Sequence, residues 1–273
     1  EREVVDDSRV VYRTYTCTLD PAQAFRPVPE KTFTWVSPPV PPYAEPVSIN
    51  SGETPCFAGT RLELSDAVPP MPILTTYAST DGGATPQIIR TPSFRTTCSF
   101  VDFNGDGRLD MVTQATGLYR GGLRETISRF VSQTAVDHEV SIHLQDEAAK
   151  FPQVPTAHKK LRIDLGSVPL RGSSMFDAYR FGGLVDVTGD FDGDKWRDLV
   201  VQDRPDRLAI YFSGPLGFGE SPHSAINVAP NTTFHTADIN GDGLSDLVVT
   251  WSANDAASGH AQTRVYFARR DKP

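Results

Sequence analysis

Asp102-Phe-Asn104-Gly-Asp106-Gly-Arg108-Leu-Asp110 is the first of three versions of one phrase in this chain. The others are Asp190-Phe-Asp192-Gly-Asp194-Lys-Trp196-Arg-Asp198 and Asp238-Ile-Asn240-Gly-Asp242-Gly-Leu244-Ser-Asp246. Each places side-chain oxygens at positions 1, 3, 5 and 9. Calcium prefers six to eight oxygen ligands at roughly 2.3–2.6 Å, and carboxylates this close together repel one another unless a cation lies between them. The phrases therefore predict three calcium loops, here called loop 1 (102–110), loop 2 (190–198) and loop 3 (238–246).

Five residues in each loop are expected to hold the metal, for about three calcium ions in all. Positions 1, 3, 5 and 9 would use their side chains. Position 7 varies freely, as expected if only its backbone carbonyl binds. The predicted ligands are Asp102, Asn104, Asp106, Arg108, Asp110, Asp190, Asp192, Asp194, Trp196, Asp198, Asp238, Asn240, Asp242, Leu244 and Asp246.

Loop 2 departs from the other two loops at position 6. It has Lys195 where the others have Gly107 and Gly243. A left-handed turn at this position suits glycine and costs another residue about 1 kcal/mol. Loop 2 also has the most carboxylates, which should favour the cation. We expect the penalty at Lys195 to dominate and to make the middle site weaker.

The segments on both sides of each loop predict β-strands. Apolar or β-branched runs follow the ninth position, at 111–113, 199–201 and 247–249. Extended runs precede the loops, at 98–101, 183–187 and 234–237. An EF-hand instead connects two helices and requires a glutamate at position 12. That position is Thr113, Val201 or Val249 here, which excludes a helical calcium sensor.

A calcium loop between strands, repeated in tandem and followed by Asp-Leu-Val-Val, resembles the FG-GAP/VCBS repeat family. The match is good around 98–114, 183–202 and 231–250, and the strand and Gly-Phe-Gly turn of 208–219 extend it. The resemblance implies an all-β fold, a β-propeller or partial propeller of calcium-bearing blades, as in integrin α-subunit heads and many bacterial secreted proteins. It is specific for fold and metal but not for function.

The composition agrees with an extracellular β-protein. The net charge of −8 argues against nucleic acid or an anionic membrane surface as a partner. No apolar run approaches the roughly 18 residues of a membrane helix, so no membrane insertion is expected. Loops of weak to moderate affinity fill in millimolar external calcium and stay largely empty in the cytosol. We therefore expect an extracellular, cell-surface or periplasmic location.

Residues 1–95 form a first, proline-rich β region without calcium motifs. Eight prolines fall between Pro21 and Pro46 and predict an extended, partly polyproline II segment. That segment is either a ligand for an aromatic groove or a strap or linker. Two runs, 10–16 and 32–36, have strand-like patterns.

Residues 96–273 are expected to form the propeller blades, with an insertion near 115–182. Loops 1 and 2 start 88 residues apart but loops 2 and 3 only 48. Residues 138–145 and 160–165 alternate as strands do. They predict either a long β-hairpin that projects from the propeller, joined through 146–158, or an ordinary blade with a long loop.

The three cysteines, Cys17, Cys56 and Cys98, precede loop 1. One disulfide with one free thiol is expected in an oxidising compartment, with Cys56 as the favoured partner. Three buried unpaired cysteines are the alternative. No cysteine and histidine cluster of the kind that binds zinc occurs.

The sequence contains no motif of a known enzyme class, and we expect no enzyme. It has no nucleophile elbow, phosphate loop or dinucleotide fingerprint. Arg197, Arg204 and Arg207 with Asp203 and Asp206 either line a site for an acidic sugar or form a solvated turn.

The expected function is adhesion or recognition of a protein or glycan on a surface. The alternative is a structural propeller segment of a larger secreted toxin or surface assembly, and a polysaccharide-acting enzyme is the least favoured hypothesis. Partner contacts are expected in the exposed segments 146–158 and 213–220 and around Arg204.

Overall fold

The computed structural model describes the backbone of residues 2–6, 9–16, 28–36, 45–49, 55–66, 68, 72–81, 86–91, 96–116, 135–164, 183–229, 232–252 and 261–269. Side chains are described within these ranges from residue 56 onward, except those of residues 72, 96, 116 and 252. Every regular element among these residues is a β-strand, which confirms the predicted all-β class. The chain divides into two compact units, residues 1–59 with 77–87 and residues 60–76 with 88–273.

The first seven strands form two sheets, ordered β1-β2-β3 and β4-β5-β6-β7. Their bounds are β1 (Arg2–Asp6), β2 (Arg9–Thr16), β3 (Val28–Val36), β4 (Glu45–Ile49), β5 (Pro55–Leu64), β6 (Pro72–Ser79) and β7 (Gln87–Thr91). The predicted strands at 10–16 and 32–36 are confirmed as parts of β2 and β3. Most of the proline-rich segment lies outside the described residues, so its polyproline II conformation stays a prediction.

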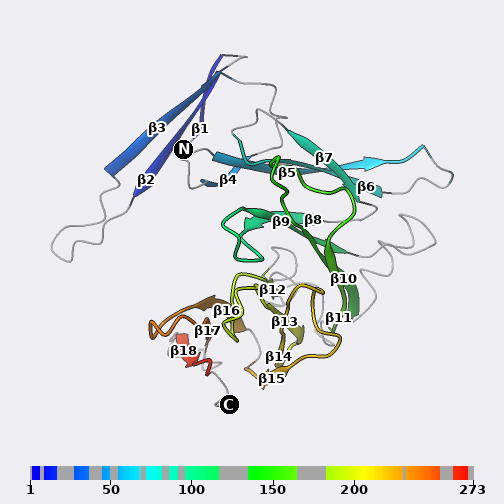
Figure 1. The fold of residues 1–273 in the computed structure, drawn as a ribbon, viewed down its shortest axis with the longest axis vertical. Helices are drawn as coiled ribbons and strands as arrows, with labels where there is room; N and C mark the ends of the chain where they lie inside the picture. Colours follow the sequence, from blue (N-terminus) through cyan, green and yellow to red (C-terminus); the bar gives the residue numbers. More distant parts are fainter. Residues whose placement is uncertain are drawn as a thin grey trace. The chain divides into compact units, whose positions relative to one another are not determined.

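The second unit contains three further sheets, each an antiparallel meander in chain order (Figure 1). Sheet 1 consists of β8 (Thr96–Val101), β9 (Asp110–Thr116), β10 (Ala135–His143) and β11 (Ala157–Asp164). Sheet 2 consists of β12 (Val185–Asp186), β13 (Leu199–Arg204), β14 (Arg207–Tyr211) and β15 (Ser224–Asn227). Sheet 3 consists of β16 (Thr232–Ala237), β17 (Asp246–Ser252) and β18 (Ala261–Tyr266). In each sheet the predicted calcium loop joins the first strand to the second.

The strands at 138–145 and 160–165 belong to sheet 1 rather than to a projecting insertion. Residues 138–143 lie in β10 and residues 160–164 in β11, and these two strands pair with each other. β10 also pairs with β9 along six residues, from His138 with Thr116 to His143 with Met111. The structure therefore corrects the projecting hairpin: β10 and β11 are the third and fourth strands of an ordinary four-stranded sheet and are joined by a long connection. Two parts of the predicted insertion, 117–134 and 165–182, lie outside the described residues.

The three sheets of the second unit pack through two hydrophobic clusters, with sheet 2 between the other two. Along β13, Leu199 and Val201 belong to the cluster shared with sheet 1, whereas Val200 belongs to the cluster shared with sheet 3. All three side chains are fully buried. Successive residues of a strand point to opposite faces, so a continuous apolar run suits a sheet covered on both sides. This packing holds the three loops in one unit.

His143, at the end of β10, should make folding stability depend on pH. Its ring is buried, and Nδ1 lies 2.8 Å from the carbonyl oxygen of Pro152. Burial lowers the pKa of His143, and the bond to Pro152 opposes this. Between the lowered pKa and the ordinary value of 6.5, the unfolded chain binds more protons. Stability should therefore be lost as the pH falls below about 6.5.

Urea unfolding of the wild type and His143→Gln at pH 5 to 8 in excess calcium tests this. The glutamine amide can still donate to Pro152 but does not titrate. The variant should lose less stability on acidification than the wild type. Parallel pH curves for the two proteins would contradict the assignment.

Candidate metal centres

The three loops share one pattern of backbone hydrogen bonds to side-chain oxygens. The position 5 amide donates to the position 3 side chain, the position 6 amide to the position 1 carboxylate, and the position 7 amide to the position 5 carboxylate. The distances are 3.1, 3.0 and 2.9 Å in loop 1, 3.1, 3.0 and 2.8 Å in loop 2, and 2.9, 3.0 and 2.9 Å in loop 3. Similar sequence thus produces the same local fold three times, with positions 1, 3 and 5 turned toward the loop interior.

Positions 4 and 6 of every loop have positive φ. Position 4 is glycine throughout, with φ of 70°, 80° and 75°. Position 6 is Gly107 at 85°, Lys195 at 79° and Gly243 at 84°. Lys195 therefore adopts the left-handed conformation that the sequence predicts for it. It also contacts loop 1, since a β-carbon added at Gly105 would lie 2.8 Å from that of Lys195.

Lys195→Gly should tighten calcium at loop 2. Glycine removes a left-handed penalty of about 1 kcal/mol, which is about a five-fold change in affinity if the ion selects that conformation. The substitution also removes a positive charge near the ligands. Calorimetry should show one calcium step tightened and the others little changed. An unchanged or weaker step would mean that the Lys195 contact with loop 1 matters more than its backbone strain.

The ninth position anchors each loop to a strand further along the same sheet. Asp110, Asp198 and Asp246 are all completely buried. One oxygen of each accepts from the position 2 amide, at 2.9, 2.7 and 3.0 Å. The other accepts from an amide just beyond the third strand, of Gln145, Ser213 or Ala268, at 2.8, 2.9 and 3.0 Å. Position 9 is thus a structural link between loop and sheet, whatever part it also plays in metal binding.

The electrostatics of the loops favour a bound cation. Burial raises the pKa of Asp110 to about 6 and that of Asp198 to about 7, although two backbone amides oppose the shift in each case. The neighbouring carboxylates at positions 1 and 3 add to the shift at Asp198. Burial also raises the pKa of Asp192. Ionisation of these three carboxyl groups of loops 1 and 2 is therefore unfavourable unless positive charge compensates for it.

Two observations show that the residues fit a hard cation. Asp190, Asp192 and Asp194 of loop 2 bring carboxylate oxygens within 4.8 Å of one another. In loop 1, Asp102 has one buried side-chain oxygen, Oδ1, without a hydrogen-bond partner. A buried oxygen in this state carries an unfavourable desolvation energy that a metal ion would offset. Loops 1 and 3 have asparagine at position 3, so each offers one carboxylate fewer than loop 2.

Position 7 contributes packing as well as a carbonyl group. Trp196 lies edge-on to Phe103 of loop 1, with 5.9 Å between the ring centroids. Leu244 is buried. Arg108 instead folds back over its own loop, where Nη2 lies 2.6 Å from Asp106 Oδ2. Its guanidinium pairs with one carboxylate oxygen of Asp106, a predicted ligand. The side chain at position 7 therefore affects the ligand set of loop 1.

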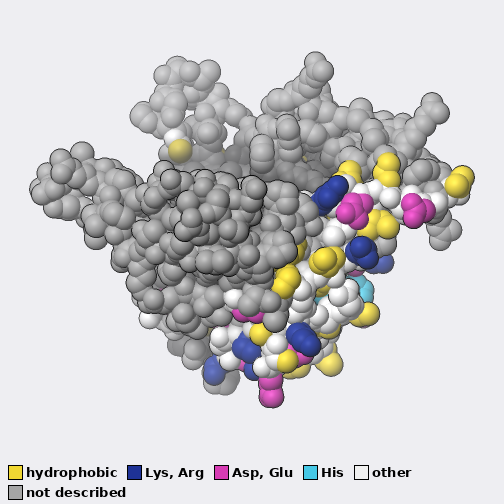
Figure 2. Space-filling view, turned by 90° about the horizontal axis from the view of Figure 1, so that it is seen from above, with side chains coloured by type: hydrophobic (Ala, Val, Ile, Leu, Met, Phe, Trp, Pro, Cys, Tyr) yellow, Lys and Arg dark blue, Asp and Glu magenta, His cyan; other side chains and the backbone are white. Residues whose placement is uncertain are grey.

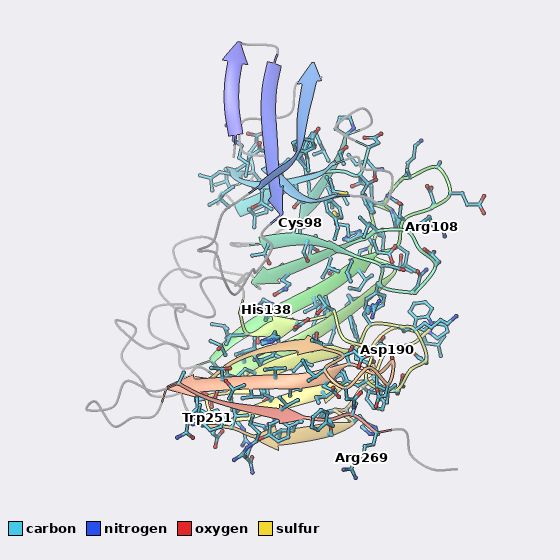
Figure 3. All side chains as sticks on the ribbon, turned by 90° about the vertical axis from the view of Figure 1, so that its left-hand side faces the viewer. Cys98, Arg108, His138, Asp190, Trp251 and Arg269 are labelled. Carbon is cyan, nitrogen blue, oxygen red and sulfur yellow. The ribbon has the colours of Figure 1, made fainter. Side chains whose placement is uncertain are left out.

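Sequence reasoning missed the residues at position 8. Arg197 and Ser245 contact the preceding loop, and no pattern in the sequence indicates this because their side chains differ. Figure 3 shows Arg108 and Asp190 at the same end of the second unit's stacked sheets, with Trp251 at the opposite end. Loops 1 and 2 therefore lie at the same end of the strands, and Ser245 brings loop 3 into contact with loop 2 there.

The other predicted features have mixed outcomes. Cys98 has a free thiol, and Cys56 lies buried in β5. Cys17 lies outside the described residues, so a bridge to Cys56 stays a prediction.

Arg207 pairs with Asp203, and Arg204 with Asp206 across 3.9 Å. Asp203 is buried, and Arg197 bonds instead to the carbonyl of Asp102, so the five residues do not form one solvated turn. No helix among the described residues has the length and apolar character to cross a membrane.

Comparison with known families finds an internal repeat. Residues 190–249 match the model of the FG-GAP-like repeat. The matched stretch contains loops 2 and 3 and the strands between them, β13 to β16. It lies within the region where the sequence resembles this family. No match was found among curated proteins.

Proposed function

We propose that this chain, which carries an FG-GAP-like repeat at residues 190–249, is a calcium-stabilised β-propeller module that recognises a protein or glycan outside the cell. One observation carries the metal part of the proposal. Three loops with the same hydrogen bonds join the first and second strands of three consecutive sheets. Each loop would bind one calcium ion through the side chains of positions 1, 3, 5 and 9 and the carbonyl of position 7.

Calcium suits these loops better than other common metals. The proposed donors are all oxygen atoms. This disfavours zinc, because most zinc sites in proteins include cysteine sulfur or histidine nitrogen ligands. Magnesium requires near-ideal octahedral geometry and keeps several of its waters, whereas calcium accepts six to eight oxygens in flexible arrangements. Four side chains and one carbonyl would leave room for water in such a shell. Calcium concentrations high enough for moderate sites occur outside the cytosol, which supports an extracellular, cell-surface or periplasmic location.

Two exposed segments form a candidate recognition surface. The turn at 213–220 meets the start of β11, because a β-carbon added at Gly217 would lie 3.2 Å from that of Ala157. Lys159 donates to the carbonyl groups of Gly219 and Glu220 at 2.6 and 2.7 Å. The segment before β11 exposes 77% of Val154, and the turn exposes Leu216 fully. The two predicted contact segments, one from sheet 1 and one from sheet 2, thus contact each other and each present an apolar side chain.

Other described residues also expose apolar side chains, among them Val68, Leu64 and Ile88. On the face drawn in Figure 2, the apolar side chains of described residues are interspersed with Lys, Arg, Asp and Glu. Single apolar side chains on a surface are ordinary, whereas a continuous patch marks an interface. The Val154 and Leu216 region is favoured because loops on a rigid scaffold are the usual place for recognition.

One observation favours the alternative, a structural propeller segment of a larger secreted assembly. Position 2 is buried in loops 1 and 2, where Phe103 and Phe191 are 0% and 7% exposed. In loop 3 the equivalent Ile239 is 53% exposed. Phe103 and Phe191 belong to the two clusters that join consecutive sheets. A further sheet packed on sheet 3 would cover Ile239 in the same way.

The calcium proposal is tested by counting ions with calorimetry and native mass spectrometry. The wild type should bind three calcium ions, and each of Asp106→Ala, Asp194→Ala and Asp242→Ala should remove one. Asp137→Ala is the matched control, because this exposed aspartate lies on β10 outside the loops. The proposal would be contradicted if the wild type bound no calcium, or if the number of bound ions were the same in the three variants as in the wild type.

Recognition is tested separately with a glycan array and cell-surface binding. Val154→Asp with Leu216→Asp should abolish partner binding while leaving calcium affinity intact. If loss of a ligand such as Asp106 abolishes binding in a protein that stays folded, the ion itself contacts the partner, and a lectin is favoured. No enzymatic activity is expected. Turnover of an acidic polysaccharide would support the enzyme hypothesis instead.

A further inference from the structure

Consecutive loops are joined by backbone hydrogen bonds from position 8. This position lies between the carbonyl at position 7 and the buried aspartate at position 9. In loops 2 and 3 its amide does not bond within its own loop. It donates to a carbonyl at the start of the preceding loop.

Arg197 makes this connection between loops 2 and 1. Its backbone amide donates to the carbonyl of Phe103 at 2.8 Å. Its side-chain Nε donates to the carbonyl of Asp102 at 3.1 Å. Asp102 is the first predicted ligand of loop 1, and its Oδ1 is the buried oxygen without a partner. Ser213 fixes Arg197 from the other side, through Oγ at 2.7 Å from the carbonyl of Arg197.

Ser245 makes the equivalent connection between loops 3 and 2. Its backbone amide donates to the carbonyl of Asp190 at 2.7 Å. Its hydroxyl accepts from the Asp190 amide at 2.9 Å. Both backbone groups of the first predicted ligand of loop 2 are therefore held by one residue of loop 3. Asp190 is only 8% exposed, so water does not readily replace these bonds.

We propose that Arg197 and Ser245 are positioning residues that couple calcium binding between neighbouring loops. The inference rests on the proposed calcium function. An ion held by positions 7 and 9 fixes the backbone of position 8 between them. That backbone in turn fixes the first ligand of the preceding loop, which then loses less conformational freedom when its own ion binds. The coupling is reciprocal, because each ion must raise the affinity of the other by the same factor.

The order of the contacts specifies which pairs of sites are coupled. Loop 2 contacts loop 1 through Arg197 and loop 3 through Ser245. No hydrogen bond or ion pair of the described residues joins loops 1 and 3 directly. Inactivating loop 2 should therefore weaken both neighbours, and the two remaining sites should bind independently of each other.

The experiment uses the full chain, calcium as the only ligand, and calorimetric titration. Asp106→Ala leaves loops 2 and 3, and these should bind with positive cooperativity. Adding Ser245→Ala removes the hydroxyl bond but keeps the backbone amide bond, so it should lower the cooperativity and weaken loop 2 by about five-fold, the effect of one lost hydrogen bond. Ser245→Thr keeps the hydroxyl and should restore cooperativity. Asp194→Ala leaves loops 1 and 3, which should show two independent steps.

Arg197 supplies a second test that does not depend on Ser245. In an Asp242→Ala background, Arg197→Ala removes the Nε bond and keeps the backbone amide. It should weaken loop 1 and lower its cooperativity with loop 2. Independent sites in the Asp106→Ala protein, with constants unchanged by Ser245→Ala, would overturn the coupling while leaving calcium binding intact. Absence of calcium binding in the wild type would instead contradict the proposed function.

Discussion

Removal of calcium should lower the melting temperature of the second unit by tens of degrees. Each ion that binds only the folded state stabilises it by about 2.7 kcal/mol at a hundredfold excess over Kd. Three ions together would contribute about 8 kcal/mol, comparable with the whole stability of an ordinary domain. For a unit of this size, 1 kcal/mol shifts the melting temperature by about 2–4 °C, which gives a fall of about 15–30 °C. Scanning calorimetry with excess chelator and then excess calcium measures it.

The triple variant Asp106→Ala, Asp194→Ala, Asp242→Ala provides the control. Its melting temperature should be low and insensitive to both calcium and chelator. Magnesium at the same concentration should restore little stability to the chelated wild type, because it keeps its waters and octahedral shell. Identical melting curves with chelator and with calcium would mean that the loops fold without the ion.

The sequence predicted the loops and their flanking strands well because both depend on local interactions. A turn with oxygens at positions 1, 3 and 5 satisfies its own backbone amides, and all of those bonds lie within nine residues. Lys195 shows the strength of this constraint, since it adopts a φ of 79° despite its side chain. The apolar run Leu199-Val200-Val201 likewise predicted a strand, and the structure covers that strand on both faces.

The sequence predicted less well where the outcome depends on contacts between sheets. The β10 and β11 strands were found, but alternation along a strand does not say which neighbour it pairs with. Pairing with β9 therefore came only from the structure. The same is true of Ser245, whose hydroxyl bonds to Asp190 across 55 residues. A backbone amide has no side-chain signature, so the connections at position 8 could not be recognised beforehand.

Asp198→Ala should cause a larger loss of stability than substitution of any other predicted ligand of loop 2. The carboxylate accepts from the amides of Phe191 and Ser213, at 2.7 and 2.9 Å, and its side chain is completely buried. Each buried amide left without a partner costs about 1–3 kcal/mol, so the variant should lose about 2–6 kcal/mol even in saturating calcium. Asp198→Asn should lie between the variant and the wild type, since one amide oxygen can still accept.

Two matched variants separate this structural role from metal binding. Asp192→Asn gives loop 2 the residue that loops 1 and 3 have at position 3, and its oxygen can still accept from the Asp194 amide. Its stability in excess calcium should change by no more than about 0.5 kcal/mol. Asp194→Ala removes a ligand at an exposed position, so its loss should be limited to the binding energy of one ion. Urea unfolding in excess calcium ranks the three proteins. If Asp198→Ala is no less stable than Asp194→Ala, position 9 acts only through the metal, and the two buried amides must find other partners.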